Sequence, residues 1–437
     1  MPVGVQPRPG RPVLVVLLLA STLGVMGGAT IAPIIEVIRQ DLAVGGTEAG
    51  LILTSHSLAI AVLSPLAGRA ADRFGIRVPL AGGLVLYGVG GGAGMLTSTL
   101  PTLLATRLVL GAGAAAVFTC STVAMLALYQ GPDRDRVMGW RTTAVTVGGF
   151  AYPLAAGVLG HVSWHAPFAI YLVGVPLGVA TLLIIPAGTA ASIRPDQGAG
   201  SSPTGRRGAV RLLRDRPLLL GLCGIWVATA GLMMVLAVFL PRRLDQLGIQ
   251  DTVLVAVYSM VVSGAAASLA GLAYARLRTR LSYPALLRGA VLCWTAAFVA
   301  FAVADHPVPL LLVPALTGLG SGLAMPTLTV LIDHTAPPGR RGTATSLQGS
   351  ALFGGQFVSP LVFGPLIEAT SITVGALTAA AGTTLMFIAL LRLPDPEWPA
   401  SRRPAAPGDG PPDGTARRTP PPVPGPRDSA ARDASPS

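Results

Sequence analysis

The chain contains no lysine, and only 11% of its 437 residues are charged. Soluble domains carry about a quarter charged residues, so this chain lacks the polar surface of a soluble protein. Without lysine it also lacks the Gly-Lys-Ser or Gly-Lys-Thr loop that binds nucleotide phosphates, which excludes an ATP-driven pump on this one chain. Hydrophobic residues make up 51%, and the mean hydropathy is +0.65. We therefore predict an integral membrane protein built from helices that satisfy their own backbone hydrogen bonds.

Cysteine is nearly absent as well. Cys120, Cys223 and Cys293 lie far apart inside apolar runs, with neither the spacing of a metal site nor a disulfide pattern. We expect them to be reduced residues packed among helices. Because no histidine-rich or cysteine-rich cluster and no catalytic set of side chains is evident, we expect no metal, no cofactor and no enzyme activity.

Apolar runs near the length of about 20 residues that a bilayer core requires fill most of the chain. The first run is too long for a signal peptide and has no convincing cleavage site, so we interpret it as an uncleaved span. We place twelve spans, at residues 12–35, 48–68, 78–98, 100–128, 139–160, 166–186, 217–240, 251–274, 283–303, 308–332, 342–367 and 371–392.

The arginines set the topology of these spans. With both termini inside, all but four of the 31 basic residues fall in inner segments or the tails. Arg141 is counted with the inner segments. The exceptions are Arg39, Arg242 and Arg243 in outer loops and Arg107 within a span. Such an asymmetry fits the positive-inside rule and predicts a multi-pass protein of the cell membrane with both termini in the cytoplasm. The net charge of +12 therefore reflects topology, and we expect no nucleic acid as a partner.

The two halves of the chain resemble each other. Gly68, Arg73 and Arg77 recur at one constant offset as Gly271, Arg276 and Arg280. This repeat predicts two six-helix bundles related by a pseudo-twofold axis along the membrane normal. We divide the chain into a cytoplasmic N-terminus at 1–11, a first bundle at 12–186, a cytoplasmic linker at 187–216, a second bundle at 217–393 and a disordered cytoplasmic tail at 394–437.

The segment GRAADRFGIR at residues 68–77 closely resembles the signature loop between the second and third spans of the major facilitator superfamily, whose members are secondary transporters with twelve spans in two bundles. The resemblance extends to about residue 393. It implies an all-α fold with pseudo-twofold symmetry and a cytoplasmic latch that is closed in the outward-open state and broken in the inward-open one. The alternative is that these arginines only fix topology.

Each latch residue has a physical role to fill. Gly68 allows close helix approach, and Gly75 permits the tight turn into the next span. The resemblance places Asp72 at the positive N-terminal end of the eleventh span, near Gly342. Arg73 would pair with an acid at the inner end of the fourth span. The full set of latch residues is Gly68, Asp72, Arg73, Gly75, Arg77, Asp133 and Asp135.

Two further stretches resemble motifs of the same superfamily. RLVLGAGAAA from Arg107 is similar to its fourth-span motif, and because a charge inside the bilayer is costly, we expect Arg107 to face the central cavity or a polar partner. A structural arginine bonded to backbone carbonyls is the alternative. The fifth span resembles the glycine and proline motif of drug and proton antiporters, although Tyr152 and Ala156 replace glycine. The matching residues are Gly139, Gly148, Pro153 and Gly157.

Candidates for ion coupling and substrate contact are few, because none of the acids lies at mid-depth in a span. His56 titrates near neutral pH and is one coupling candidate, with an interhelical hydrogen-bonding role as the alternative. The other coupling or cavity candidates are Arg107, Glu36, Asp333, Gln348 and Gln356. Substrate contacts on the first, fourth, seventh and tenth spans would involve Thr30, Phe118, Trp226, Met233 and Met325, for which ordinary helix packing is the alternative.

These features favour proton-coupled export of a small hydrophobic or amphipathic organic compound by alternating access. Uptake or facilitated passage of a small polar or anionic solute is the alternative, supported by the broken fifth-span motif and the missing mid-membrane acid. A sensor without transport activity is a third hypothesis, which no appended signalling domain supports. We expect a monomer in the bilayer, with a small-molecule substrate and protons as its partners.

Overall fold

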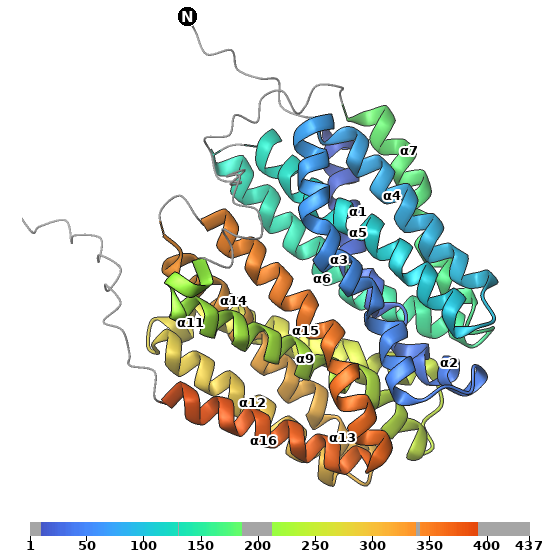
Figure 1. Cartoon of the computed structure of the whole chain (residues 1–437), viewed down its shortest axis with the longest axis vertical. Coiled ribbons are helices and arrows are strands. Elements are labelled where there is room, and N and C mark those ends of the chain that lie inside the picture. Colours follow the sequence, from blue (N-terminus) through green and yellow to red (C-terminus); the bar gives the residue numbers. More distant parts are fainter. Residues whose placement is uncertain (1–9, 130, 186–211, 338–340, 392–437) are drawn as a thin grey trace, which may run out of the picture. The chain divides into compact units, whose positions relative to one another are not determined.

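The computed structural model describes residues 10–129, 131–185, 212–337 and 341–391, and every regular element in these ranges is a helix (Figure 1). Eleven helices are long and apolar enough to cross a membrane, and a twelfth span is formed if the bent helix pair at 11–24 and 26–41 counts as one. The predicted all-α membrane fold is thereby confirmed, with eleven or twelve spans among the described residues. The N-terminal segment 1–9, most of the linker and the tail from 392 onward lie outside the described residues.

The first half of the chain folds into a bundle in which α5 packs against α3 and α4, and α7 packs against α4. Glycines permit these close crossings, because a Cβ on Gly113 of α5 would lie 2.4 Å from the backbone nitrogen of Tyr87 on α4. The elements are α1 (Arg11–Ala29), η1 (Ala32–Ile34), α2 (Ile35–Asp41), α3 (Gly46–Phe74), α4 (Arg77–Gly92), η2 (Ala93–Leu96), α5 (Leu100–Leu128), α6 (Gly131–Gly160), η3 (Ala166–Val173) and α7 (Gly174–Ile184).

The second half repeats this arrangement, with α14 packed against α11 and α12, and α16 against α12. The eighth predicted span contains a π-helical turn, η4, between α10 and α11. The elements are α9 (Pro217–Gln246), α10 (Thr252–Ala256), η4 (Val257–Val261), α11 (Val262–Arg278), α12 (Tyr283–Val303), α13 (Pro307–Leu310), α14 (Leu312–Thr335), α15 (Arg341–Ala369) and α16 (Ile372–Leu391).

Two predicted span boundaries differ from the structure. The first span does not end at residue 35 but bends by 51° and continues as helix to Asp41, so that Glu36 lies on α2 and not in a loop. The fifth span begins earlier than predicted, because α6 starts at Gly131. Arg141 lies inside the candidate membrane segment Arg136–Gly160, as it also lies inside the predicted span 139–160, so that counting it with the inner segments was wrong.

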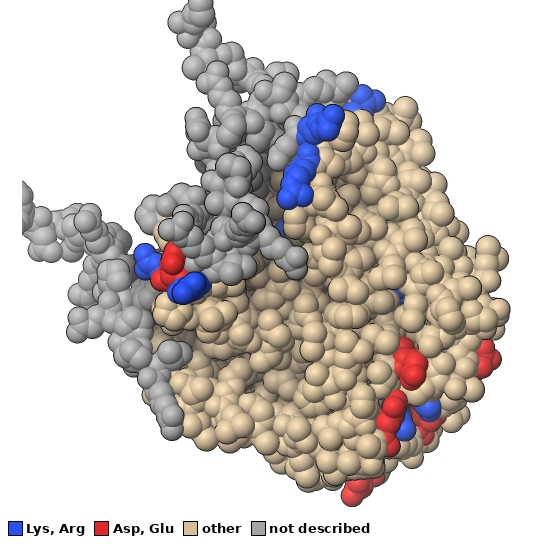
Figure 2. All heavy atoms as spheres, in the orientation of Figure 1, with Lys and Arg blue, Asp and Glu red and all other residues tan. Residues whose placement is uncertain are grey.

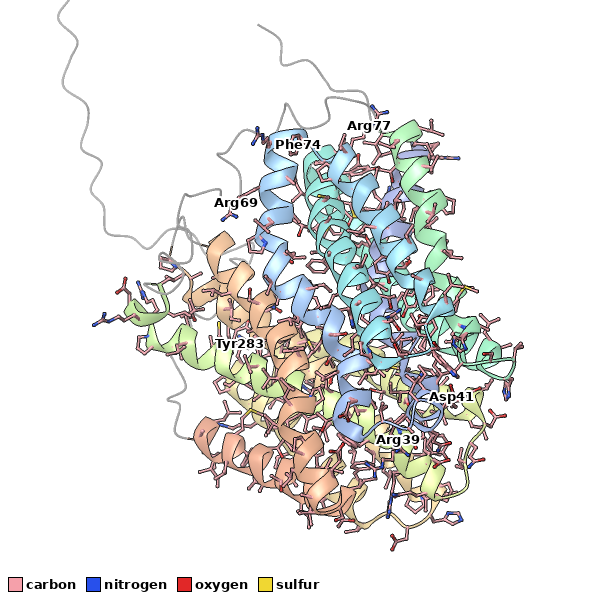
Figure 3. All side chains as sticks on the ribbon, turned by 45° about the vertical axis from the view of Figure 1, so that its right-hand side comes forward. Arg39, Asp41, Arg69, Phe74, Arg77 and Tyr283 are labelled. Atoms are coloured by element: carbon pink, nitrogen blue, oxygen red, sulfur yellow. The ribbon has the colours of Figure 1, made fainter. Side chains whose placement is uncertain are left out.

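The two ends of the molecule differ in charge. Arg69, Phe74 and Arg77 lie at the end that holds the α3–α4 turn, which we call the inner end, and Arg39 and Asp41 lie at the opposite, outer end (Figure 3). On the face shown in Figure 2, basic atoms gather toward the inner end and most visible acidic atoms lie toward the outer end. This distribution agrees in sense with the arginine asymmetry of the sequence.

Candidate functional site

The two halves touch along α3 and α15, and the contacts run from the outer end to the middle of these helices. A Cβ on Gly50 would lie 2.2 Å from Cβ of Pro360, and the Ser57 hydroxyl donates to the Gln356 side-chain oxygen at 2.9 Å. Gly68 follows eleven residues after Ser57, a spacing that returns to the same helix face. A Cβ there would meet nothing within 4 Å. The contact between the halves therefore ends toward the inner end of α3.

Helix α6 shows the same divergence against α10 and α11. A Cβ on Gly157 would lie 2.9 Å from the backbone oxygen of Thr252, and the ring of Phe150 lies 3.0 Å from the Cβ position of Gly264. Gly139 shares this face of α6 by helical spacing, and a Cβ there would meet nothing within 4 Å. Both helix pairs are therefore in contact toward the outer end, and no described residue lies within 4 Å of the Cβ positions of Gly68 and Gly139 near the inner end.

Polar contacts reinforce the closed outer end. The backbone N–H of Thr47 donates to a carboxylate oxygen of Glu368 at 2.8 Å, and the Gln40 amide donates to Asp245 at 3.1 Å. Each of these hydrogen bonds joins the first half to the second. Glu36 takes no part in this contact, because its carboxylate is buried and accepts hydrogen bonds from Arg39 and Gln40 on its own helix.

At mid-depth, two aromatic rings meet across the interface. Phe118 of α5 and Phe353 of α15 pack edge to face with centroids 6.1 Å apart, and 44% of Phe118 is exposed. The guanidinium carbon of Arg141 lies 5.9 Å from the centroid of the Phe118 ring. Nε of Arg141 donates to the Ser21 hydroxyl on α1 at 3.3 Å, and Nη2 donates to the Thr122 hydroxyl on α5 at 3.1 Å. Arg141 thus joins three helices of the first half beside the aromatic contact.

Tyr152 lies on the same side of α6 as Arg141 and also contacts α1. Its hydroxyl is 2.6 Å from the hydroxyl of Thr22, and the Cβ position of Gly148 is 3.1 Å from Cβ of Thr22. A larger residue at 148 would therefore push α6 away from α1. Pro153 is buried inside α6, as expected for a proline that shapes a span.

Of the two settings expected for Arg107, the central cavity or a polar partner, the structure shows the second, inside its own bundle. Arg107 has no exposed surface and lies between the rings of Phe168 and Tyr171, with its guanidinium carbon 4.9 and 4.8 Å from their centroids. Nη1 donates to the Tyr171 hydroxyl at 3.2 Å and Nη2 to the Gly91 carbonyl at 3.4 Å. The alternative of a structural arginine bonded inside its own bundle describes this arrangement better, because aromatic faces and a carbonyl supply the partners of the charge.

His56 is buried between α1 and α5. Its ring atoms Cδ2 and Nε2 lie 3.0 Å from the Cβ position of Gly27, and Gly111 approaches its backbone oxygen. Nδ1 has no hydrogen-bond partner among the described residues, and neither has the buried hydroxyl of Thr30. Two polar groups without described partners therefore lie within the first bundle near its bent first span.

The candidates of the second half lie mostly within their own bundle. Trp226 is buried with its indole N–H unpartnered in the described part of the chain, and Met233 accepts a hydrogen bond on sulfur from Ser321 at 3.3 Å. The Gln348 amide donates to Thr329 at 3.0 Å, and Met325 is half-buried on α14. Among the sequence candidates whose side chains are described, Gln356 and Phe118 reach the other half. The side chain of Asp333 lies outside the described residues.

Of the charged latch residues, the side chains of Arg73, Arg77 and Asp133 are described. Arg73 is exposed and stacks over the neighbouring ring of Phe74 at 5.5 Å, and no ion pair joins it to Asp133. Arg77 donates instead to the Leu182 carbonyl on α7. Gly75 has φ +76°, which confirms its role in the tight turn, whereas no described helix approaches Gly68. The side chains of Asp72 and Asp135 lie outside the described residues, so the latch stays a prediction.

No group of three or more histidine, cysteine, aspartate or glutamate side chains that could hold a metal ion occurs among the residues that the structure describes.

The residues that the sequence analysis missed are Arg141 with its partners on α1 and α5, and Ser57 and Phe353 at the interface. A signal for Arg141 was available, because this arginine already lay inside the predicted span at 139–160.

The profile of the Major Facilitator Superfamily matches residues 17–360 and 265–424 of the chain. Among curated proteins, the multidrug efflux protein YfmO of Bacillus subtilis is 24% identical over 84% of this chain and 91% of its own length. The cephamycin export protein CmcT of Amycolatopsis lactamdurans is 31% identical over 51% of this chain, and that match spans 42% of the relative's own length.

Among solved structures, a point mutant of the nucleoside transporter NupG superposes with a TM-score of 0.76. It is 15% identical, and the match covers 87% of this chain and 99% of that one. A likeness at this identity shows the fold, and it agrees with the two-bundle arrangement described above.

Proposed function

Because the chain belongs to the Major Facilitator Superfamily, we propose that it exports a small hydrophobic or amphipathic organic compound by alternating access, with protons as the coupling ion. Proteins of this family and fold are membrane transporters and not enzymes. The chain is accordingly a multi-pass membrane transporter. Its direction of transport, its coupling ion and the class of its substrate are the parts that we propose.

The observation that carries the proposal is the change of contact along single helix faces. On α3 and on α6, residues near the outer end touch the second half, whereas the Cβ positions of Gly68 and Gly139, on the same faces near the inner end, have no described atom within 4 Å. Alternating access requires two bundles that pack tightly at one end while they are separated at the other. An exporter in this state would receive its substrate from the inner side.

Two features favour an apolar or amphipathic substrate and the direction of export. The described contacts at the middle of the interface involve two phenylalanine rings, one serine and one glutamine, and Arg141 beside them is the basic group. Such a lining suits a compound with a large apolar part. Relatives of this chain are named as an efflux protein and an export protein, which supports export.

Proton coupling would use a titratable group whose proton affinity differs between the two conformations, and shielding from bulk water in one of them produces such a difference. His56 fits this requirement through its buried Nδ1, which lacks a partner among the described residues. Glu36 fits it less well, because Arg39 holds it as an ion pair. We propose His56 as the coupling residue. We also propose that the protein acts as a monomer in the plasma membrane and that both of its termini lie in the cytoplasm.

Inside-out membrane vesicles with an imposed proton gradient test the function. The probes are ethidium, N-phenyl-1-naphthylamine and 2-naphthoate, which carry a positive, a zero and a negative charge. We expect at least one to accumulate several-fold in vesicles that contain the protein, and nigericin to abolish the accumulation. Vesicles without the protein are the control. Accumulation in right-side-out vesicles alone would instead support uptake, and transport of none of the three would contradict the proposal.

A further inference from the structure

Arg141 is a cation inside a membrane-spanning segment whose described partners are all neutral. Its hydrogen bonds go to the hydroxyls of Ser21 and Thr122, and its third neighbour is the ring of Phe118. Among the described residues no carboxylate lies within 4.0 Å of it, since the ion pairs found there join Arg39 to Glu36, His161 to Asp251 and Arg243 to Asp305. The positive charge therefore lacks a compensating negative charge in the described part of the bundle.

The contrast with Arg107 shows that Arg141 is not simply a packing residue. Arg107 has no exposed surface, and two aromatic faces and a carbonyl surround its guanidinium. Arg141 is only half-buried. Its Nη1 atom makes no hydrogen bond with a described residue. This atom is also not one of the buried side-chain atoms that lack a partner. The two hydroxyls bonded to Arg141 fix the guanidinium plane, and neither of these bonds uses Nη1. A planar guanidinium held in this way can donate to two oxygens of one acidic group.

The surroundings specify the rest of a ligand. The ring of Phe118 lies against the guanidinium and is 44% exposed, and its edge-to-face partner Phe353 comes from the other half. Gly24 of α1 lies beside Phe118, since its Cβ position is 3.7 Å from that ring. An acidic group at Arg141 would therefore place an attached ring or apolar chain against two aromatic side chains, one from each bundle.

We propose that Arg141 is the binding residue for the acidic group of an amphipathic organic anion, such as an aromatic carboxylate, and that Phe118 and Phe353 contact its apolar part. This inference rests on the proposed export function and narrows its substrate class. A cationic compound would be repelled by the uncompensated guanidinium, and a neutral one would lack the charge–charge attraction and the pair of charged acceptor oxygens. An anion that contacts both bundles would also bind differently in the two conformations, as alternating access requires.

Ligand-induced thermal stabilisation of the purified full chain tests this site without any assumption about direction or coupling. The probes are benzoate, 2-naphthoate and indole-3-acetate at pH 7.5, each compared with its own carboxamide, which keeps the shape and removes the charge. We expect the acids to raise the Tm in a saturable manner and the carboxamides to bind at least about tenfold more weakly. Equal stabilisation by acids and carboxamides, or no stabilisation by any acid, would overturn the proposal.

Variants then assign the effect to Arg141. Arg141→Gln should weaken acid binding at least about tenfold, and Arg141→Lys should retain part of it, because lysine keeps the charge but loses the planar fork. Arg136→Gln is the matched control, since Arg136 is an exposed arginine near the start of the same helix. If Arg141→Gln does not fold, the lysine variant and the comparison of acid with amide still decide the question. Unchanged acid binding in both Arg141 variants would contradict the inference.

Failure of this inference can be told apart from failure of the export proposal. Acids that bind through Arg141 but show no gradient-driven accumulation in inside-out vesicles would contradict export and leave the binding site intact. Gradient-driven accumulation of ethidium or N-phenyl-1-naphthylamine, unaffected by Arg141→Gln, would support export and overturn the anion site.

Discussion

Phe118 and Phe353 meet edge to face with ring centroids 6.1 Å apart, one from each half of the chain. The rings stand near the level where contact between the halves ends. Toward the outer end, glycine-lined crossings and hydrogen bonds join the bundles, and toward the inner end the Cβ positions of Gly68 and Gly139 on the same faces have no described atom within 4 Å. The aromatic contact therefore lies beside the boundary between the closed and the open part of the interface. The following predictions test this arrangement.

Loss of the Glu368 carboxylate should weaken the closed outer end. This group accepts a hydrogen bond from the Thr47 backbone across the interface, and such a bond contributes about 0.5–1.5 kcal/mol. We expect Glu368→Ala to shift the equilibrium toward an outward-open state by up to about tenfold. The measurement is the distance between spin labels at Val162 and Thr370 in a cysteine-free background. An unchanged distance distribution in Glu368→Ala would contradict the role of this contact.

A methyl group at Gly157 should also open the outer end. Its Cβ would lie 2.9 Å from the Thr252 backbone oxygen, so α6 and α10 would have to separate. We expect Gly157→Ala to lengthen the same label distance and to reduce transport. Gly139→Ala on the same helix face is the matched control, because a Cβ there meets nothing within 4 Å in this state. Equal outer distances in the two variants would show that the Gly157 crossing does not hold the closure.

Arg107 should act on stability more than on transport chemistry. Arg107→Gln removes two aromatic contacts and the charge-assisted hydrogen bonds to Tyr171 and Gly91, and we expect a loss of about 2–4 kcal/mol in unfolding free energy. Thermal unfolding in detergent measures the effect, with Leu108→Ala on the exposed side of α5 as control. An Arg107→Gln variant with normal stability and no transport would instead show that Arg107 acts in transport.

The orientation predicted from the arginines can be tested by labelling. With both termini in the cytoplasm, a cysteine at Gln246 should react with a membrane-impermeant maleimide from outside. A cysteine at Gly198 should react only after the membrane is permeabilised. The position of Gly198 lies outside the described residues, but the topology assigns it to the cytoplasmic linker. The reverse pattern of labelling would overturn the topology.

Much of the fold could be predicted from hydropathy, because each span had to be long and apolar enough for a bilayer. The errors came where length alone does not fix the boundary. The first span continues past residue 35 because Glu36 is neutralised by Arg39 one turn later, so a charged pair is tolerated on a helix. The fifth span takes in Arg141 because hydroxyls of neighbouring helices accept its hydrogen bonds.

The candidate site was less predictable, since it depends on which face of each helix meets which neighbour. Arg107 was singled out because it is charged within a span, yet its partners Phe168 and Tyr171 come from η3, a distant part of the sequence. No sequence pattern pairs such residues. Ser57 and Gln356 likewise become partners only because α3 crosses α15. The spacing of residues along one helix predicts which of them share a face. Which neighbouring helix that face contacts can be known only from the folded structure.

The central claim is that the two bundles alternate between two states, one closed at the outer end and the other closed at the inner end. The most direct test is a double electron–electron resonance measurement on labels at Arg136 of α6 and Arg276 of α11, both exposed near the inner end, in lipid nanodiscs at several pH values. The account predicts a long inner distance for the state described here and a second, shorter population that grows while the Val162–Thr370 distance lengthens. A single inner distance under all conditions, independent of the outer one, would contradict it.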